Sequence, residues 1–176
     1  MLTDGPFFGG SIADLEAVAG QVALTVLRKD FILDEAQVLE ARAAGAAAVL
    51  LIVRALTPPR LSELLACTRE AGMEALVEVH TAVELDTALA AGAAVVGVNS
   101  RDLDTSRIDL DAAWRLVAGV PRDVIAVAES GMATTADVEC AAAAGADAVL
   151  IGTALSGAPD PADGVRALAG VRRRAR

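Results

Sequence analysis

A short signal that recurs along the chain limits what it can fold into. Each copy is Ala-Gly followed by small residues and an apolar run, with glycines at Gly45, Gly72, Gly92, Gly119 and Gly145. Successive glycines lie 27, 20, 27 and 26 residues apart, and the copy at Gly119 is looser because it carries Pro121. A glycine at such a place can end a helix in the left-handed conformation, and a short apolar run suits a buried strand. The repeat therefore predicts βα units and a parallel sheet.

The same repeat gives the boundaries of the predicted elements. Segments upstream of the glycines have helical periodicity, and several begin with Asp, Ser or Thr as capping residues. The predicted helices span residues 35–44, 59–71, 82–91, 111–118 and 135–144, with another beginning at Asp160. The predicted strands span residues 2–3, 24–27, 49–53, 75–79, 95–98, 125–128 and 148–151. That makes about seven strands, of which the first is a stub.

Length and charge exclude several classes of protein. The 176 residues suit a single domain, 1–176, whose last residues, 171–176, form a basic tail. We interpret that tail as solvated rather than as a binding patch. The net charge of −9 argues against non-specific binding to nucleic acid.

The apolar runs are too short to span a bilayer, and no signal peptide opens the chain, so we expect a cytoplasmic location and no membrane partner. No metal site is predicted, because His80 is the only histidine and neither Cys67 nor Cys140 has a partner at ligand spacing. Both cysteines are expected to be small buried hydrophobes.

Polar side chains follow almost every predicted strand. They are Lys29, Arg54, Glu78, Asn99-Ser100-Arg101, Glu129-Ser130-Gly131 and Gly152-Thr153. The carboxyl ends of parallel strands lie on one face of a sheet, so we expect these groups to converge there.

Lys29 and Glu78 are the sharpest pair in this set. Glu78 lies inside the apolar run Leu76-Val77-Glu78-Val79, and Lys29 belongs to the charged exit Arg28-Lys29-Asp30. Together they would make a general acid and a general base. Two alternatives remain open: a structural salt bridge between them, and a plain surface loop at Arg28–Asp30.

Two later exits contain glycines and precede predicted helices. Backbone N–H groups at Ser130-Gly131 and Gly152-Thr153 could hold a phosphate group. Glycine spacing alone is a weak signal and favours plain turns at both places.

The longest motifs resemble one family, indole-3-glycerol phosphate synthase. The matching runs include Leu2-Thr3-Asp4, Phe7-Phe8-Gly9-Gly10-Ser11, Leu27-Arg28-Lys29-Asp30-Phe31, Leu76-Val77-Glu78-Val79-His80, Gly97-Val98-Asn99, Glu129-Ser130-Gly131 and Val149-Leu150-Ile151-Gly152. The resemblance implies a (β/α)8 TIM-barrel fold of the α/β class. It also implies closure of the indole ring in tryptophan biosynthesis, by a carbon–carbon lyase without a cofactor.

The resemblance also implies a role for each matching residue. Lys29 would be the general acid and Glu78 the carboxylate that assists dehydration. Asn99 and Arg101 would line the anthranilate side, Glu129 would order that site, and Phe8 and Phe31 would be apolar walls. The phosphate end of the substrate would be held by Ser130, Gly131, Gly152 and Thr153.

The chain departs from the family pattern at its beginning. Family members carry a first strand ending in Glu-x-Lys before the Leu-Thr-Asp strand, whereas here Met1 falls on that second strand. We therefore expect a barrel without its first βα unit, with open edges that favour self-association or a partner chain. The alternative function is a non-catalytic paralogue or split-barrel subunit that binds a phosphorylated or indole-like ligand. A relative of phosphoribosylanthranilate isomerase is disfavoured, because we find no Cys/Asp pair at the early strand ends.

Overall fold

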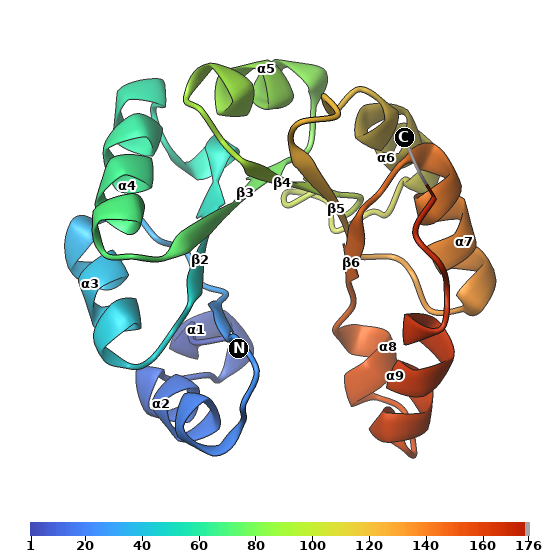
Figure 1. Cartoon of the computed structure of the whole chain (residues 1–176), viewed down its shortest axis with the longest axis horizontal. Helices are drawn as coiled ribbons and strands as arrows, with labels where there is room; N and C mark the ends of the chain where they lie inside the picture. Colours follow the sequence, from blue (N-terminus) through green and yellow to red (C-terminus); the bar gives the residue numbers. More distant parts are fainter. Residues whose placement is uncertain (175–176) are drawn as a thin grey trace. The chain divides into compact units, whose positions relative to one another are not determined.

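The computed structural model describes residues 1–174, which cluster into two compact units (Figure 1). Unit 1 comprises Met1–Glu78 with Asp86–Val95, and unit 2 comprises Val79–Leu85 with the chain from Val96 onward. The division falls at the end of β3 and around α5 (Ala82–Ala90). The prediction of one domain over residues 1–176 stays a prediction.

Unit 1 contains three parallel strands in the order β1-β2-β3. Its elements are α1 (Gly5–Phe8), α2 (Ile12–Gln21), β1 (Leu27–Arg28), α3 (Glu35–Ala43), β2 (Ala48–Ile52), η1 (Val53–Ala55), α4 (Pro58–Glu70) and β3 (Glu74–Val79). Side chains on these strands alternate between two covered faces, so β2 and β3 are almost wholly buried. The register places Ile52 beside Glu78, so the charged residue lies at the carboxyl end of the strands.

Unit 2 repeats the same alternation of strand and helix. Its elements after α5 are β4 (Val95–Asn99), α6 (Leu110–Ala118), β5 (Ile125–Glu129), α7 (Thr135–Ala144), β6 (Ala148–Leu150), α8 (Thr153–Ser156) and α9 (Pro161–Ala169). The strand order is β4-β5-β6, and β5 pairs with β6 in parallel, with Glu129 opposite Leu150. Figure 1 shows β5 leading into α7 and β6 leading into α8 and α9.

Most of the predicted helix ends are confirmed. The five helices predicted from the repeat are α3 to α7, and α9 follows Asp160, which caps it. Left-handed φ angles occur at Gly45 (88°), Gly72 (70°), Gly92 (82°) and Gly145 (105°). At Gly119 the expectation is wrong: its φ of −84° is right-handed, because the turn tightens there and Val120 N donates to Val117 O.

The first two predicted strands differ from the structure. The segment 24–27 was expected to be strand throughout, but β1 begins only at Leu27 and Leu24 is 78% exposed. Its partner β2 begins at Ala48, so residues further upstream have no ladder to join. Leu2 makes an isolated parallel bridge to Lys29 rather than a strand, and residues 1–174 hold six strands instead of about seven.

Two further features were not expected. Helices α1 and α2 are capped by Asp4 and Ser11, whose side chains accept from Phe7 N and Asp14 N. Cys140 is exposed and Cys67 is half-buried, so the burial expected for both thiols is wrong, although both are free. Within residues 1–174, none of the helices has the length and hydropathy needed to cross a bilayer.

Candidate active site

Lys29 and Glu78 meet at the carboxyl end of the strands of unit 1. Lys29 Nζ lies 3.6 Å from Glu78 Oε2, and the two side chains are 28% and 1% exposed. Lys29 directly follows β1 and Glu78 lies near the end of β3, so the pair bridges the two strands that flank β2. The ammonium therefore reaches solvent while the carboxylate is enclosed, an arrangement that suits proton exchange with a bound molecule.

Lys29 is also the only lysine in the sequence; every other cationic side chain except His80 is arginine. Arginine holds its proton too tightly to donate it, whereas an ammonium can release one. The single lysine therefore lies where a proton donor would be needed.

The charges that flank Lys29 face away from Glu78. Arg28 is 5% exposed and its guanidinium contacts Thr3, Asp30 and Glu40 on the side of the strand covered by α3. The alternative of a plain surface loop is therefore wrong for Arg28, which is built into the structure.

The aromatic residues of unit 1 make one contact that was not predicted. Phe31 packs edge to face against Phe7, with ring centroids 6.1 Å apart at 66°. Phe8 is 57% exposed. Phe7 was not among the predicted wall residues, and only the fold of α1 brings it to Phe31.

In unit 2, Asn99 is the last residue of β4, and Arg101 lies in the tight loop that follows it. Asn99 is 9% exposed, and its Oδ1 accepts from Arg101 N at 3.0 Å. Arg101 makes an antiparallel bridge to Ile108 and donates to Ser106 O at 3.3 Å. The local turn therefore fixes the backbone at both residues.

The end of β5 connects the ends of β4 and β6. Glu129 is 1% exposed, and its backbone carbonyl accepts from Ser100 N at 3.0 Å. Ser130 N donates to Leu150 O at 3.3 Å. Ser130 and Gly131 both have left-handed φ angles, 66° and 73°, and the left-handed serine is uncommon enough to mark a constrained turn.

Ser100 directly follows β4 and was not among the predicted site residues. Its Oγ is buried and has no hydrogen-bond partner within the described residues. A Cβ added at Gly131 would lie 3.0 Å from that oxygen and 2.7 Å from Ile108 Cγ2. Only glycine fits here, so the backbone of the β5–α7 loop closely approaches the start of the β4–α6 loop.

Gly152 and Thr153 begin α8, a helix of four residues. No heavy atom lies within 4 Å of a Cβ built at Gly152, and Thr153 is exposed. The space beside Gly152 is therefore open. Its assignment to phosphate binding, like the other assigned roles, stays a prediction.

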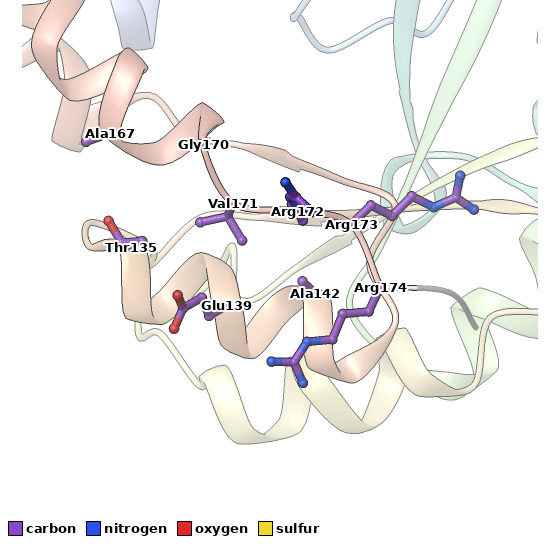
Figure 2. A pocket seen from close by; sticks show the side chains of 9 residues that line it. All are labelled: Thr135, Glu139, Ala142, Ala167, Gly170, Val171, Arg172, Arg173 and Arg174. Carbon is purple, nitrogen blue, oxygen red and sulfur yellow. The ribbon is translucent and has the colours of Figure 1, made fainter.

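A separate hollow of about 440 Å³ is lined by α7, α9 and the residues after α9 (Figure 2). Thr135 and Glu139 line one side and Arg172, Arg173 and Arg174 the other, and none of the predicted site residues takes part. Arg173 pairs with Asp147 at 2.6 Å, so the predicted basic tail is partly anchored rather than simply solvated. Its last two residues, 175 and 176, lie outside the described residues.

Metal binding finds no support in residues 1–174, where no cluster of three His, Cys, Asp or Glu side chains could hold an ion. His80 Nδ1 lies 3.4 Å from Glu84 Oε2, and His80 N donates to the same oxygen at 2.6 Å. The single histidine is therefore engaged with the first turn of α5.

Comparison with known protein families decides the family. The model of indole-3-glycerol phosphate synthase matches residues 1–168. The chain belongs to the indole-3-glycerol phosphate synthase family. It is 53% identical over 165 residues to the indole-3-glycerol phosphate synthase of Mycolicibacterium vanbaalenii, covering 94% of this chain and 61% of that protein.

A second relative has a similar identity and a similar coverage. The indole-3-glycerol phosphate synthase of Mycobacteroides abscessus is 52% identical over 161 residues, covering 92% of this chain and 59% of the relative. The chain thus spans about three fifths of the length of these relatives.

Solved structures confirm the fold class of this member of the indole-3-glycerol phosphate synthase family. The crystal structure of 3-hexulose-6-phosphate synthase from Salmonella typhimurium superposes with a TM-score of 0.80 at 21% identity, covering 95% of this chain and 82% of that one. A native KDPGal structure gives a TM-score of 0.63 at 24% identity, covering 93% of this chain and 74% of that one. The α/β fold of the (β/α)8-barrel type is confirmed, and these two likenesses support the fold alone.

Proposed function

We propose that this chain takes part in indole-3-glycerol phosphate synthesis. The substrate is 1-(2-carboxyphenylamino)-1-deoxyribulose 5-phosphate, and the products are indole-3-glycerol phosphate, carbon dioxide and water. The observation that carries the proposal is the Lys29–Glu78 pair, 3.6 Å apart at the carboxyl end of the strands in a chain of this family.

Lys29 acts as the general acid. A new carbon–carbon bond forms when the aromatic ring carbon attacks the ketone carbon, and the ketone oxygen gains negative charge. An ammonium at this point protonates that oxygen and so gives a hydroxyl group, while loss of carbon dioxide restores the aromatic ring. The partial exposure of Lys29 supports this role, because its Nζ is reachable from solvent.

Glu78 acts in the dehydration that follows. Lys29, once reprotonated from solvent, protonates the hydroxyl group so that it leaves as water, and Glu78 accepts the proton that is lost from the new ring. Because the two groups lie 3.6 Å apart, a proton taken up by Glu78 can return to Lys29. No redox partner is needed, since decarboxylation and dehydration are both redox-neutral here.

Polar groups at the ends of β4, β5 and β6 are suited to binding rather than to proton transfer. We assign the anthranilate side to Asn99, Arg101 and Glu129, and the phosphate group to the backbone at Gly131 and Gly152. Open space beside Gly152 and the left-handed turn at Ser130-Gly131 support the second assignment.

The proposal is tested by adding the carboxyphenylamino substrate to the purified chain and following the fluorescence of the indole product. Replacing Glu78 by Gln, or Lys29 by Met, is expected to lower kcat by about 10² to 10⁴. Glu74→Gln is the matched control, because Glu74 lies on the same strand but is exposed. Equal rates for Glu78→Gln and Glu74→Gln would contradict the assigned role.

A calorimetric titration with indole-3-glycerol phosphate distinguishes an enzyme from a binding protein. Turnover together with binding supports the proposal. Binding without turnover, even at high protein concentration, would favour the non-catalytic alternative and overturn the catalytic one.

A further inference from the structure

We propose that Arg28, linked to Thr3 and Asp30, is a positioning residue that aims Lys29 at Glu78. The kinetic part of this inference rests on the proposed function, whereas the geometric part does not. Residues 28 and 30 point to one side of the chain and Lys29 points to the other, as in any extended segment. Whatever fixes the two flanking side chains therefore fixes the direction in which Lys29 leaves the backbone.

Every nitrogen of the Arg28 guanidinium is engaged. Nε donates to Thr3 Oγ1 at 3.1 Å, and Nη2 donates to Asp30 Oδ2 at 3.1 Å. Nη1 donates at 2.7 Å both to Gln37 O and to Glu40 Oε2. A rigid planar fork with partners on all sides cannot shift without breaking several charged hydrogen bonds at once.

Thr3 closes the cluster and also touches the backbone of Lys29. Its hydroxyl donates to Asp30 Oδ2 at 2.6 Å while accepting from Arg28, and its backbone N–H donates to Lys29 O at 3.2 Å. Asp30 Oδ1 in turn accepts from Phe31 N at 2.8 Å. Hydrogen bonds therefore hold the residue before Lys29 (Arg28), the residue after it (Asp30) and Thr3, which bonds to its backbone.

Burial makes this cluster stiff. Arg28, Thr3 and Asp30 are 5%, 7% and 11% exposed, the last as a side-chain value. Charged groups removed from water must keep their partners, so the low-energy arrangements are few. A lysine side chain has many rotamers, and displacement of a reacting group by about 1 Å can cost about 10²-fold in rate.

A second arginine cluster in the same unit provides a comparison. Arg60 on α4 donates to Glu35 Oε1 at 2.5 Å and to Glu63 Oε2 at 2.9 Å, and is 26% exposed. It has three charged partners, Asp34, Glu35 and Glu63, against two for Arg28, but it joins helices α3 and α4 rather than the segment around Lys29. Loss of this cluster should weaken packing without redirecting Lys29.

The test uses Thr3→Val, which keeps the shape of the side chain and removes the hydroxyl group. Thr3→Ser restores the hydroxyl, Asp30→Asn is a second variant in case Thr3→Val fails to fold, and Arg60→Gln is the matched control. Because Lys29 is the only lysine, protein labelled with ¹³C-lysine gives one set of side-chain resonances. We measure the nuclear Overhauser effect between the ε protons of Lys29 and the γ protons of Glu78, together with kcat and KM.

The proposal predicts that Thr3→Val loses the Lys29–Glu78 Overhauser effect and lowers kcat by about 10²-fold at nearly unchanged KM. Thr3→Ser and Arg60→Gln are expected to keep the Overhauser effect and the wild-type kcat. An intact Overhauser effect in folded Thr3→Val and Asp30→Asn would overturn the proposal. A wild-type chain that is inactive but shows the effect, and loses it in Thr3→Val, would contradict the proposed function while supporting the positioning role.

Discussion

At the scale of single residues, two buried charged side chains of unit 1 lie in defined ion pairs. Glu78 and Arg28 are buried, yet each lies within reach of an opposite charge, Lys29 for the first and Asp30 for the second. A buried charge costs several kcal/mol unless it is paired and hydrogen-bonded. The alternation of the strand sends these two pairs to opposite faces, so one can be structural while the other reaches solvent.

Asp137 provides a residue-scale test by pH. Its carboxylate accepts from Ala133 N at 3.0 Å, and from Thr134 Oγ1 and Thr134 N at 2.8 Å, in the capping box of α7. These hydrogen bonds, that from Ala133 foremost, lower the pKa of Asp137 below its ordinary value. A lowered pKa means that the folded state binds the proton more weakly than the unfolded chain does.

The contribution of Asp137 to stability is therefore fully present above its ordinary pKa of about 3.9 and is lost as pH falls through its folded value. We expect Asp137→Asn to lower the Tm at neutral pH and to differ progressively less from wild type below about pH 4. Thermal unfolding followed by circular dichroism at several pH values measures this. A Tm difference that stayed constant down to about pH 2 would contradict the assignment.

At the scale of elements, loops that follow the strands are shaped by glycine where the backbone comes close to its neighbours. Gly131 combines a φ of 73° with side-chain atoms of Ile108 and Leu110 within 3.0 Å of an added Cβ. Gly152, by contrast, has a φ of −112° and open space. The two glycines that follow β5 and β6 thus have similar surroundings in the sequence but different backbone conformations and packing.

Gly131→Ala is expected to lower the free energy of unfolding by about 1–3 kcal/mol, because the methyl group must fit a left-handed backbone and a filled space. Gly152→Ala should change it by less than about 1 kcal/mol. Urea unfolding of both variants makes the comparison. Equal effects would mean that the β5–α7 loop can move aside.

At the scale of the whole molecule, β6, the last strand in the order, is less protected from solvent than β2 and β5. Strands β2 and β5 are buried at four of five positions, whereas β6 has one exposed and two half-buried residues. Within residues 1–174, β6 ends the strand order, so its outer edge has no strand beside it. Unpaired backbone groups on an apolar edge favour pairing with another chain.

We therefore propose that the chain self-associates or takes a partner along β6. Sedimentation velocity over a tenfold range of concentration should show a rising sedimentation coefficient. Ala148→Lys, on the exposed position of β6, should suppress that rise, since a charge on an edge strand blocks edge pairing. Ala118→Lys, on an exposed residue at the end of α6, is the control, and equal suppression by both would exclude β6 as the contact.

Much of this fold was predictable because it is built from a local repeat. Helices α3 to α7 and strands β2 to β6 follow from apolar periodicity and from glycines that end helices, both of which act over a few residues. The prediction was wrong at residues 24–27 because strand formation needs a partner, and β2 supplies one only from Ala48 onward. Helices α1 and α2 were missed because neither ends at one of the repeated glycines.

The sequence by itself determined the alternation of strand and helix, the family, and the candidate pair of Lys29 and Glu78. Only the tertiary structure decided that these two side chains meet, that Arg28 and Asp30 face away from them, and that Phe7 rather than Phe8 packs on Phe31. The physical reason is the range of the interactions. Periodicity and capping act within one element, whereas a contact between residues 29 and 78 exists only after three strands have paired in register.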